Sequence, residues 1–134
     1  MITIDTSLVV AAFASWHEAH PVARAVMARQ PRLVAHCALE AYSVLTRLPS
    51  PHRVTGQLAQ AFIAEAFPGP PLSLPPEDHS VLLELVAGRG IEGGAVYDAV
   101  VAATAVHAGA TLVSRDRRAL RTYEAVGASV ELVR

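Results

Sequence analysis

The sequence predicts an α/β fold, a sandwich in which helices pack on a parallel β-sheet. Short runs of β-branched and apolar residues alternate with helical segments along the whole chain, as is typical of parallel α/β proteins. Hydrophobic residues make up 52% and aromatic residues only 5% of the chain, which favours small helices packed closely on a sheet. The length of 134 residues fits a single domain, residues 1–134, with a sizeable core.

The first seven residues combine a strand, a carboxylate and the start of a helix. Residues 2–4 are β-branched and favour an extended backbone, so we expect a first strand there. Asp5 then lies at the carboxyl end of that strand, the edge where parallel α/β sheets collect their ligands. We expect Ser7 to cap a helix over residues 8–14. A purely structural alternative is that Asp5 itself only caps this helix.

The other helices and strands are placed by prolines, glycines and the spacing of apolar residues. Helices are expected over residues 21–29, 38–48, 54–67, 77–88, 95–108 and 117–126. Strands are expected over residues 32–35, 72–74, 111–113 and 129–133. Prolines on both sides of residues 72–74 indicate a short edge strand at that point.

Charge and cysteine content exclude several classes of function. The 11 basic and 12 acidic residues give a net charge of −1, which does not indicate a nucleic-acid-binding protein. All basic residues are arginines, which excludes mechanisms that need a lysine nucleophile, a Schiff base or a P-loop lysine. Cys37 is the only cysteine, so no intrachain disulfide forms and a reducing cytoplasm fits.

No segment of the sequence predicts a signal peptide or a membrane helix. The first residues carry no basic stretch ahead of an apolar one. The longest uncharged apolar run, residues 99–113, is shorter than the ~20 residues that a membrane-spanning helix needs. We therefore expect a cytoplasmic protein that does not associate with membranes.

The segment 95–108 predicts a buried helix, because it has almost no polar face. Asp98 lies near its start, where an unpaired carboxylate would be costly or would become protonated. The charge of Asp98 therefore needs a compensating partner. Three partners stay open: the N-terminal dipole of the same helix, a nearby arginine, or a metal ion.

Three further acids, Asp5, Glu40 and Asp116, follow predicted strands. Asp98 lies on the helix that leads into the last of these strands, so we expect all four carboxylates at one edge of the sheet. Carboxylate oxygens without histidine or cysteine are typical ligands of hard divalent cations such as Mg²⁺. Such an ion could lower the pKa of a bound water and neutralise a phosphodiester. Without an ion, repulsion among the four acids should strain the fold, or leave one of them holding a proton with a raised pKa.

Four sequence features follow one another along the whole chain: Ile4-Asp5-Thr6-Ser7, Glu40, Val96-Tyr97-Asp98-Ala99 and Leu112-Val113-Ser114-Arg115-Asp116. Together they resemble the PIN-domain ribonucleases, and in size and order the VapC toxins of bacterial toxin–antitoxin pairs. The resemblance implies a PIN-like three-layer α/β/α sandwich with a five-stranded, mainly parallel sheet. It also implies a metal-dependent endoribonuclease that uses Mg²⁺, or Mn²⁺ in its place. The implied partners are an RNA substrate, a cognate VapB-like antitoxin, and further copies in a homodimer, a heterotetramer or a larger assembly.

The resemblance assigns roles to individual residues. The inner metal ligands, which are also catalytic residues, correspond to Asp5, Asp98 and Asp116. Glu40 corresponds to a further catalytic ligand, or to a contact made through water. Small hydroxyl residues beside the acids, which can orient a carboxylate or a bound water, correspond to Thr6, Ser7 and Ser114.

Four arginines crowd the end of the chain that carries the last acid: Arg115, Arg117, Arg118 and Arg121. Guanidinium groups in this position could hold RNA phosphates. Arg115, directly beside Asp116, is the best candidate, and Arg115 and Arg117 are assigned to RNA binding. Arg118 and Arg121 are assigned to a solvated helix face.

Two other functions stay open. An acid-pocket phosphotransfer or phosphatase domain has a similar layout, but the lysine expected of it is absent and Ser7 occupies the second acid position of a D-x-D start. A non-catalytic PIN-like binding module would keep the fold without the chemistry. The intact set of four acids argues against such a module.

Two groups of residues near the first helices have a functional and a structural interpretation. His17 and His20 flank Glu18, but the H-E-x-x-H spacing and a third zinc ligand are missing, so surface histidines are expected. The second group is apolar: Val9, Val10, Phe13 and Trp16. These side chains could contact an antitoxin or a second copy, or they could belong to the ordinary core.

Overall fold

The protein has a central sheet of four parallel strands. The structure is a computed structural model, and it describes residues 1–134. The order of the strands is β2-β1-β3-β4, so β1 and β3 lie in the middle. The strands are β1 (Ile2–Ile4), β2 (Arg32–Leu33), β3 (Thr111–Ser114) and β4 (Val130–Leu132). Every neighbouring pair is parallel, which confirms the predicted α/β class.

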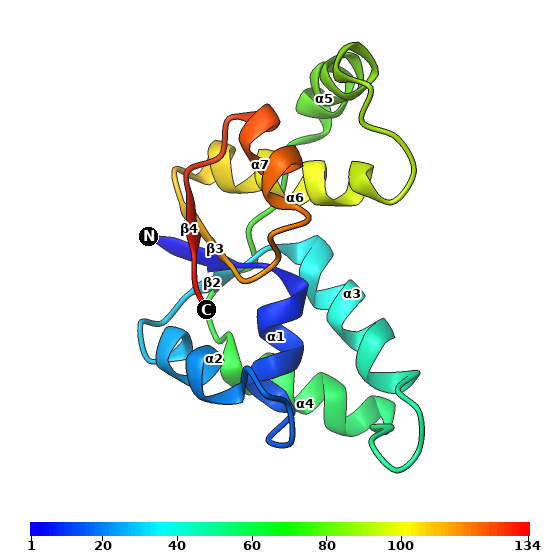
Figure 1. The fold of residues 1–134 in the computed structure, drawn as a ribbon, viewed down its shortest axis with the longest axis vertical. Coiled ribbons are helices and arrows are strands. Elements are labelled where there is room, and N and C mark those ends of the chain that lie inside the picture. The colour runs from blue at the N-terminus through cyan, green and yellow to red at the C-terminus, as the bar shows by residue number, and fades with distance from the viewer.

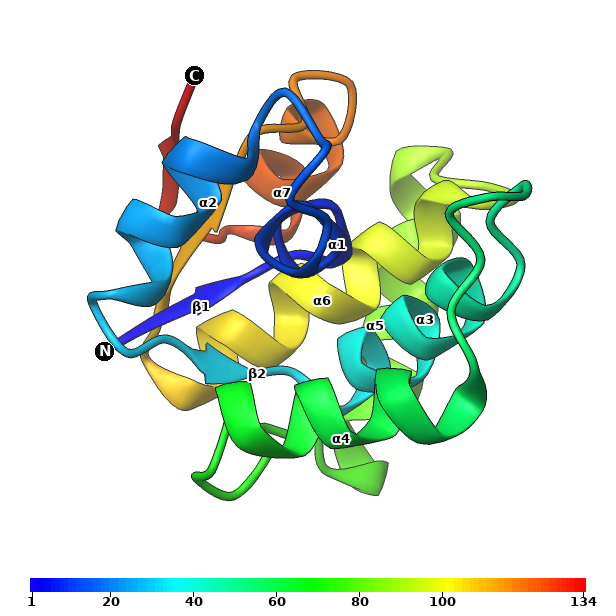
Figure 2. The same cartoon turned by 90° about the horizontal axis from the view of Figure 1, so that it is seen from below.

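Seven helices surround the sheet. They are α1 (Thr6–Phe13), α2 (His20–Met27), α3 (Ala35–Thr46), α4 (Gly56–Ala66), α5 (Pro76–Arg89), α6 (Ala95–Ala108) and α7 (Leu120–Val126). Figure 1 shows α5, α6 and α7 above the sheet and α1, α2 and α4 below it. In Figure 2, seen from below, α1 lies in front of α6. The three expected layers are therefore present. None of the helices combines the length and apolar character that crossing a membrane requires.

The expected fifth strand, residues 72–74, does not form. Only Leu72 pairs with the sheet, in an isolated parallel bridge to Val34 just beyond β2. The Leu72 N–H donates to Leu33 O at 2.8 Å, and the Ala35 N–H donates to Leu72 O at 2.8 Å. The prolines at 70–71 and 75–76 have no N–H with which to extend this pairing. The sheet is therefore four-stranded rather than five-stranded.

Four helices begin two or three residues away from their predicted positions. α3 begins at Ala35 instead of residue 38, and α4 begins at Gly56 instead of residue 54. α1 begins at Thr6 with Asp5 as its N-cap, so the prediction that Ser7 caps this helix was wrong. α7 begins at Leu120 instead of residue 117, because the Asp116 carboxylate binds backbone N–H groups of the preceding segment and holds it in a turn.

The central strands β1 and β3 are covered on both faces. Ile4, Leu112 and Val113 are each at most 1% exposed, as expected of strands that lie between two layers of helices. Ile4 pairs with Val113 in the parallel register. The next residue of each strand segment, Asp5 and Ser114, therefore comes to the same carboxyl edge of the sheet.

The apolar residues considered for a partner surface mostly belong to the core. Val9 is completely buried, and the Phe13 ring packs edge-on against Phe62 with ring centroids 5.0 Å apart. Val10 is partly buried. Trp16 differs from these three residues, because 51% of its surface is exposed.

Candidate active site

All four predicted acids line one pocket of about 370 Å³ at the carboxyl edge of β1 and β3. Segments that are far apart in the sequence meet there: the start of α1, the middle of α3, the first turn of α6 and the segment after β3. The polar and charged lining residues are Asp5, Thr6, Ser7, His17, Glu40, Asp98, Asp116, Arg118 and Tyr123. The parallel topology thus brings the acids together as the sequence predicted.

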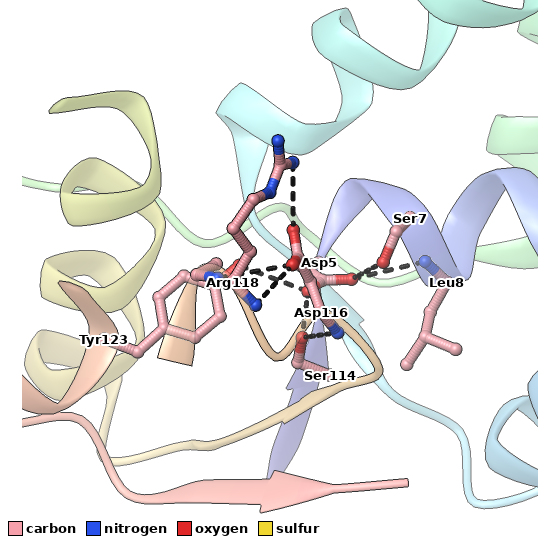
Figure 3. Close-up of polar contacts among 8 residues, drawn as sticks. Asp5, Ser7, Leu8, Ser114, Asp116, Arg118 and Tyr123 are labelled. Atoms are coloured by element: carbon pink, nitrogen blue, oxygen red, sulfur yellow. Dashed lines mark hydrogen bonds and ion pairs between the residues drawn. The ribbon is translucent and has the colours of Figure 1, made fainter. Parts of the chain in front are cut away.

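Asp5 is buried, with 4% of its surface exposed, and four donors bind its carboxylate (Figure 3). Oδ1 accepts hydrogen bonds from the Ser7 hydroxyl at 2.7 Å and from the Leu8 N–H at 3.2 Å. Oδ2 accepts from the Ser114 hydroxyl and, at 3.1 Å, from the Tyr123 hydroxyl. Asp5 therefore caps α1 and lines the pocket at the same time. The four donors offset the cost of burying its charge.

Tyr123 is a site residue that no pattern in the sequence indicated. It is 2% exposed on α7, and its hydroxyl contacts Asp5. Burial, followed by the negative charge of Asp5, raises the pKa of the Tyr123 hydroxyl above its ordinary value, so this group stays a proton donor. The only available signal was the general rule that a buried tyrosine hydroxyl needs a polar partner.

Ser114 joins the two acids that follow the central strands. Its hydroxyl donates to Asp5 Oδ2 and accepts the Asp116 N–H at 3.0 Å. The Asp116 carboxylate is itself held in place, because its Oδ1 accepts the backbone N–H groups of Arg118 at 2.9 Å and Ala119 at 3.3 Å. Asp5 and Asp116 therefore keep fixed orientations at the sheet edge.

Asp98 is half-buried in the first turn of α6 and lacks such support. Burial raises the pKa of the Asp98 carboxyl above its ordinary value, and no hydrogen bond lowers it. The neighbouring negative charges that raise this pKa further are those of Asp116, Glu40 and Asp5. The Arg118 guanidinium acts in the opposite direction. Asp98 is thus the acid whose charge most needs a cation.

Glu40 lies at the outer side of the pocket, on α3, with 41% of its side chain exposed. His36, one helical turn earlier, brings Nε2 to 3.3 Å from Glu40 Oε2. The His36 ring stacks on Tyr97 of α6, with centroids 5.5 Å apart and planes at 5°. These contacts link α3 to the helix that carries Asp98.

The predicted hydroxyl residues Thr6 and Ser7 also line the pocket. Ser7 binds Asp5, as described above. The buried Thr6 hydroxyl has no hydrogen-bond partner within the chain at ordinary distances. Burial raises the pKa of the Cys37 thiol, and the nearby Thr6 hydroxyl acts in the opposite direction, so this hydroxyl supports the wall of the pocket and does not face a ligand.

The donor set fits a hard divalent cation that keeps part of its water shell. The acids offer only carboxylate oxygens, which Mg²⁺ and Mn²⁺ prefer. No three His, Cys, Asp or Glu side chains lie close enough to hold an ion by themselves. An ion would therefore keep several waters, as Mg²⁺ usually does in proteins. The clearest sign of fit is Asp98, because it has a raised pKa among three other carboxylates.

The arginines after β3 divide between the pocket and its surroundings. Arg118 lines the pocket, with Nη2 at 3.7 Å from Asp116 Oδ2. Arg115 lines an adjoining cavity of about 260 Å³, and its Nη2 donates to Glu18 Oε1 at 3.1 Å. Arg117 is exposed and lines neither of these two cavities. The arginine within the acid pocket is therefore Arg118, which the sequence placed on a solvated helix face.

His17 lies where the pocket and the adjoining cavity meet. Residues that line both are Ser7, His17, Asp116 and Arg118. His20 lines neither of them, and its Nδ1 lies 2.8 Å from Ala11 O. The two histidines therefore lie in different surroundings, and both are partly buried instead of lying openly on the surface as expected.

Comparison with known proteins gives consistent matches over almost the whole chain. Residues 2–125 match the family described as PIN domain. The chain is 46% identical to Ribonuclease VapC40 of Mycobacterium tuberculosis, strains CDC 1551 / Oshkosh and ATCC 25618 / H37Rv, over 133 residues that cover 99% of each protein. It is 39% identical to Ribonuclease VapC27 of Mycobacterium tuberculosis, strain ATCC 25618 / H37Rv, over 130 residues that cover 96% of this chain and 94% of the relative.

We predict that Asp98→Asn leaves the metal-free protein at least as stable as the parent at neutral pH. The raised pKa of Asp98 means that the native state holds this proton more tightly than the unfolded chain does. The stabilising effect of that proton is complete below the ordinary aspartate pKa and is lost as the pH rises through the native pKa. Urea unfolding in EDTA at acidic and neutral pH measures this difference. A variant less stable than the parent at neutral pH would contradict the prediction.

Asp5→Asn should have the opposite effect, although it removes a charge from the same pocket. An amide offers only one oxygen, so two of the four donors of Asp5 lose their acceptor. We expect the metal-free variant to lose about 1–3 kcal/mol of stability. The same urea experiment, with Asp98→Asn as the matched variant, tests this expectation. Unfolding of Asp5→Asn at or above the parent midpoint would show that repulsion among the acids outweighs the hydrogen bonds.

Proposed function

The chain belongs to the PIN domain family, and from this membership we propose that it is a metal-dependent endoribonuclease. The observation that carries the proposal is the convergence of four carboxylates, from segments far apart in the sequence, on one pocket at the sheet edge. The names of the two relatives, which both contain the word ribonuclease, support RNA as the substrate.

Mg²⁺ is the proposed cofactor, and Mn²⁺ is a substitute for it. Asp5, Asp98 and Asp116 would hold the ion together with waters of its own shell, with Glu40 as a further ligand or as a contact through water. When bound, such an ion supplies the positive charge that lowers the pKa of a water and neutralises a phosphodiester. The oxygen-only donor set supports this choice over zinc.

The hydrogen bonds of the chain orient these ligands in advance. The Ser114 hydroxyl positions Asp5 and the Asp116 backbone, and the Tyr123 hydroxyl supports Asp5 from α7. Asp98 has no comparable support and has a raised pKa. A cation that enters the pocket would therefore relieve the repulsion that Asp98 experiences from the neighbouring carboxylates.

Arg118 would bind the phosphate that lies next to the acids. Its side chain is 93% exposed and only loosely paired with Asp116, so it can turn toward a phosphate at little cost. Arg115, in the adjoining cavity, would contact a neighbouring phosphate along the strand. Arg117, which is exposed outside both cavities, would contribute longer-range attraction only.

We further propose that the protein acts in the cytoplasm as the toxin of a type II, VapBC-like toxin–antitoxin pair, inhibited by a cognate VapB-like antitoxin. The VapC names of the relatives support this role. The single cysteine, Cys37, is free and buried, which suits a reducing compartment. A homodimer, or a heterotetramer or larger assembly with the antitoxin, would cover exposed apolar side chains such as Leu39 and Val81.

Neither alternative function has an observation in its favour. A phosphatase or phosphotransfer domain would need a second acid where Ser7 stands, and the Ser7 hydroxyl instead donates to Asp5. No lysine exists in the chain to bind the phosphoryl group. A non-catalytic binding module would gain nothing from an unsatisfied carboxylate such as Asp98 in its pocket.

Purified protein should cleave RNA internally in the presence of Mg²⁺ or Mn²⁺, and EDTA should stop the reaction. Cleavage should leave 5′-phosphate and 3′-hydroxyl ends, because water and not the ribose 2′-hydroxyl is the expected nucleophile. Asp98→Asn should lower kcat/KM by at least about a hundredfold. Asp78→Asn, an equivalent change in the first turn of α5, should cleave like the parent. Cyclic 2′,3′-phosphate ends, or full activity in EDTA, would refute the mechanism.

Expression of the parent chain alone should slow bacterial growth, because uncontrolled RNA cleavage would deplete RNAs that translation needs. Cells that express Asp98→Asn should grow like the empty-vector control, and co-expression of the cognate antitoxin should restore growth to cells with the parent. Growth curves at matched protein levels provide the measurement, with Asp78→Asn as a toxic control. Equal toxicity of Asp98→Asn and the parent would separate the growth effect from the acid pocket.

A further inference from the structure

Trp16 is a large side chain that stacking holds at the surface. The indole is 51% exposed and stacks on His52, with ring centroids 4.0 Å apart and planes at 28°. Trp16 lies between α1 and α2 and His52 lies between α3 and α4, so two separate connections build the pair. Figure 1 shows both connections on the side of the sheet that α4 covers. The indole is therefore held in place, and about half of its surface stays open to solvent.

His17 connects this aromatic pair to the acid pocket. Its ring centroid lies 5.9 Å from that of Trp16, and its side chain lines both the pocket and the adjoining cavity. Its Nδ1 accepts the Ala19 N–H at 3.0 Å, so the neutral ring carries its proton on Nε2. The Nε2–H group is thus a hydrogen-bond donor for a ligand in these cavities.

The wall of the same adjoining cavity carries two arginines, Arg115 and Arg118, and one acid, Asp116. Arg115 pairs with Glu18 through Nη2 and Arg118 only loosely with Asp116, so both keep guanidinium N–H groups for a ligand. A ligand that spans this region must place negative charge beside the guanidinium groups and a flat ring beside the indole. A nucleotide within single-stranded RNA has both features, a phosphate and an unpaired base that can stack on an aromatic side chain. A purely apolar protein segment would offer no partner to the His17 donor, or to the guanidinium N–H groups that Glu18 and Asp116 leave free.

We propose that Trp16 and His52 form a stacking platform for an unpaired RNA base next to the cleaved phosphate, and that His17 Nε2 donates to the phosphate of that nucleotide. This inference rests on the proposed nuclease function and names the form of RNA that the site accepts. Every base has a flat face, so the platform binds any base. A base paired within a duplex cannot stack on it. The platform therefore selects single strands without selecting a sequence.

Trp16 is the only tryptophan in the chain, so its fluorescence reports directly on the platform. We expect a single-stranded RNA of roughly ten nucleotides to quench this fluorescence in EDTA, and the same RNA annealed to its complement to quench it far less. Trp16→Ala should weaken binding of the labelled single strand, measured by fluorescence polarisation, about 5- to 150-fold. In cleavage assays KM should rise by a similar factor at nearly unchanged kcat, and Trp16→Phe should retain most of the affinity.

Two further variants separate the platform from general effects. Leu83→Ala removes another exposed apolar side chain, on α5, and should bind RNA like the parent. His17→Asn keeps an acceptor within reach of the Ala19 N–H but removes the Nε2 donor. It should therefore weaken RNA binding without lowering the melting temperature. Trp16→Ala should also melt close to the parent, because the indole is half exposed.

Several results would overturn the platform. They are unchanged Trp16 fluorescence at RNA concentrations that saturate binding, equal quenching by duplex and single strand, or a parent-like KM for Trp16→Ala. The Trp16→Ala variant could also bind RNA normally but no longer co-purify with the antitoxin. That result would assign this surface to the protein partner instead. If the parent cleaves RNA and the Trp16 and His17 variants bind and cleave RNA equally well, only the proposal of a stacking platform is refuted. If RNA quenches the fluorescence but the parent never cleaves with Mn²⁺, the platform stands and the nuclease proposal fails.

Discussion

The hydrogen bonds to the Asp5 carboxylate are the interaction on which the rest of the structure depends. Its donors come from the first turn of α1, from the end of β3 and from α7, up to 118 residues away along the chain. A carboxylate only 4% exposed would be strongly destabilising without them. These bonds therefore fix the start of the first helix, the edge of the central strands and the position of the last helix around one charge.

The four acids of the pocket consequently fall into two kinds. Asp5 and Asp116 accept hydrogen bonds from hydroxyl or backbone donors, so the folded chain holds both carboxylates in fixed orientations. Asp98 has a raised pKa without such donors, and Glu40 is partly exposed on α3 with only His36 beside it. For the proposed metal site this means that two ligands are held rigidly, while the other two supply the unmet negative charge that attracts a cation.

Local signals explain which features the sequence could predict. The parallel strands and α6 follow from β-branched runs, an apolar segment and Gly109, whose φ of 67° suits a glycine helix stop. The prediction of a fifth strand over residues 72–74 was wrong, because the flanking prolines have no N–H with which to continue the pairing. Tyr123 could not be predicted, because only the packing of α7 brings its hydroxyl to Asp5. The Arg118 side chain is solvated, as predicted, but it lies in the turn capped by Asp116, beside the pocket, and not on a helix face.

The distribution of charge around the pocket says more about the proposed substrate than the net charge does. A total of −1 gives no sign of nucleic-acid binding, yet the carboxylates gather at the strand ends while Arg115 and Arg118 line the adjoining cavity. A phosphate can approach the acids only where positive charge lies between them. Under the proposed function, the arginines would hold an RNA strand before an ion is bound, whereas entry of the cleaved phosphate into the acid pocket would require the ion. In that case Arg115 would serve strand binding alone, while Arg118, which lines both cavities, would link strand binding to cleavage.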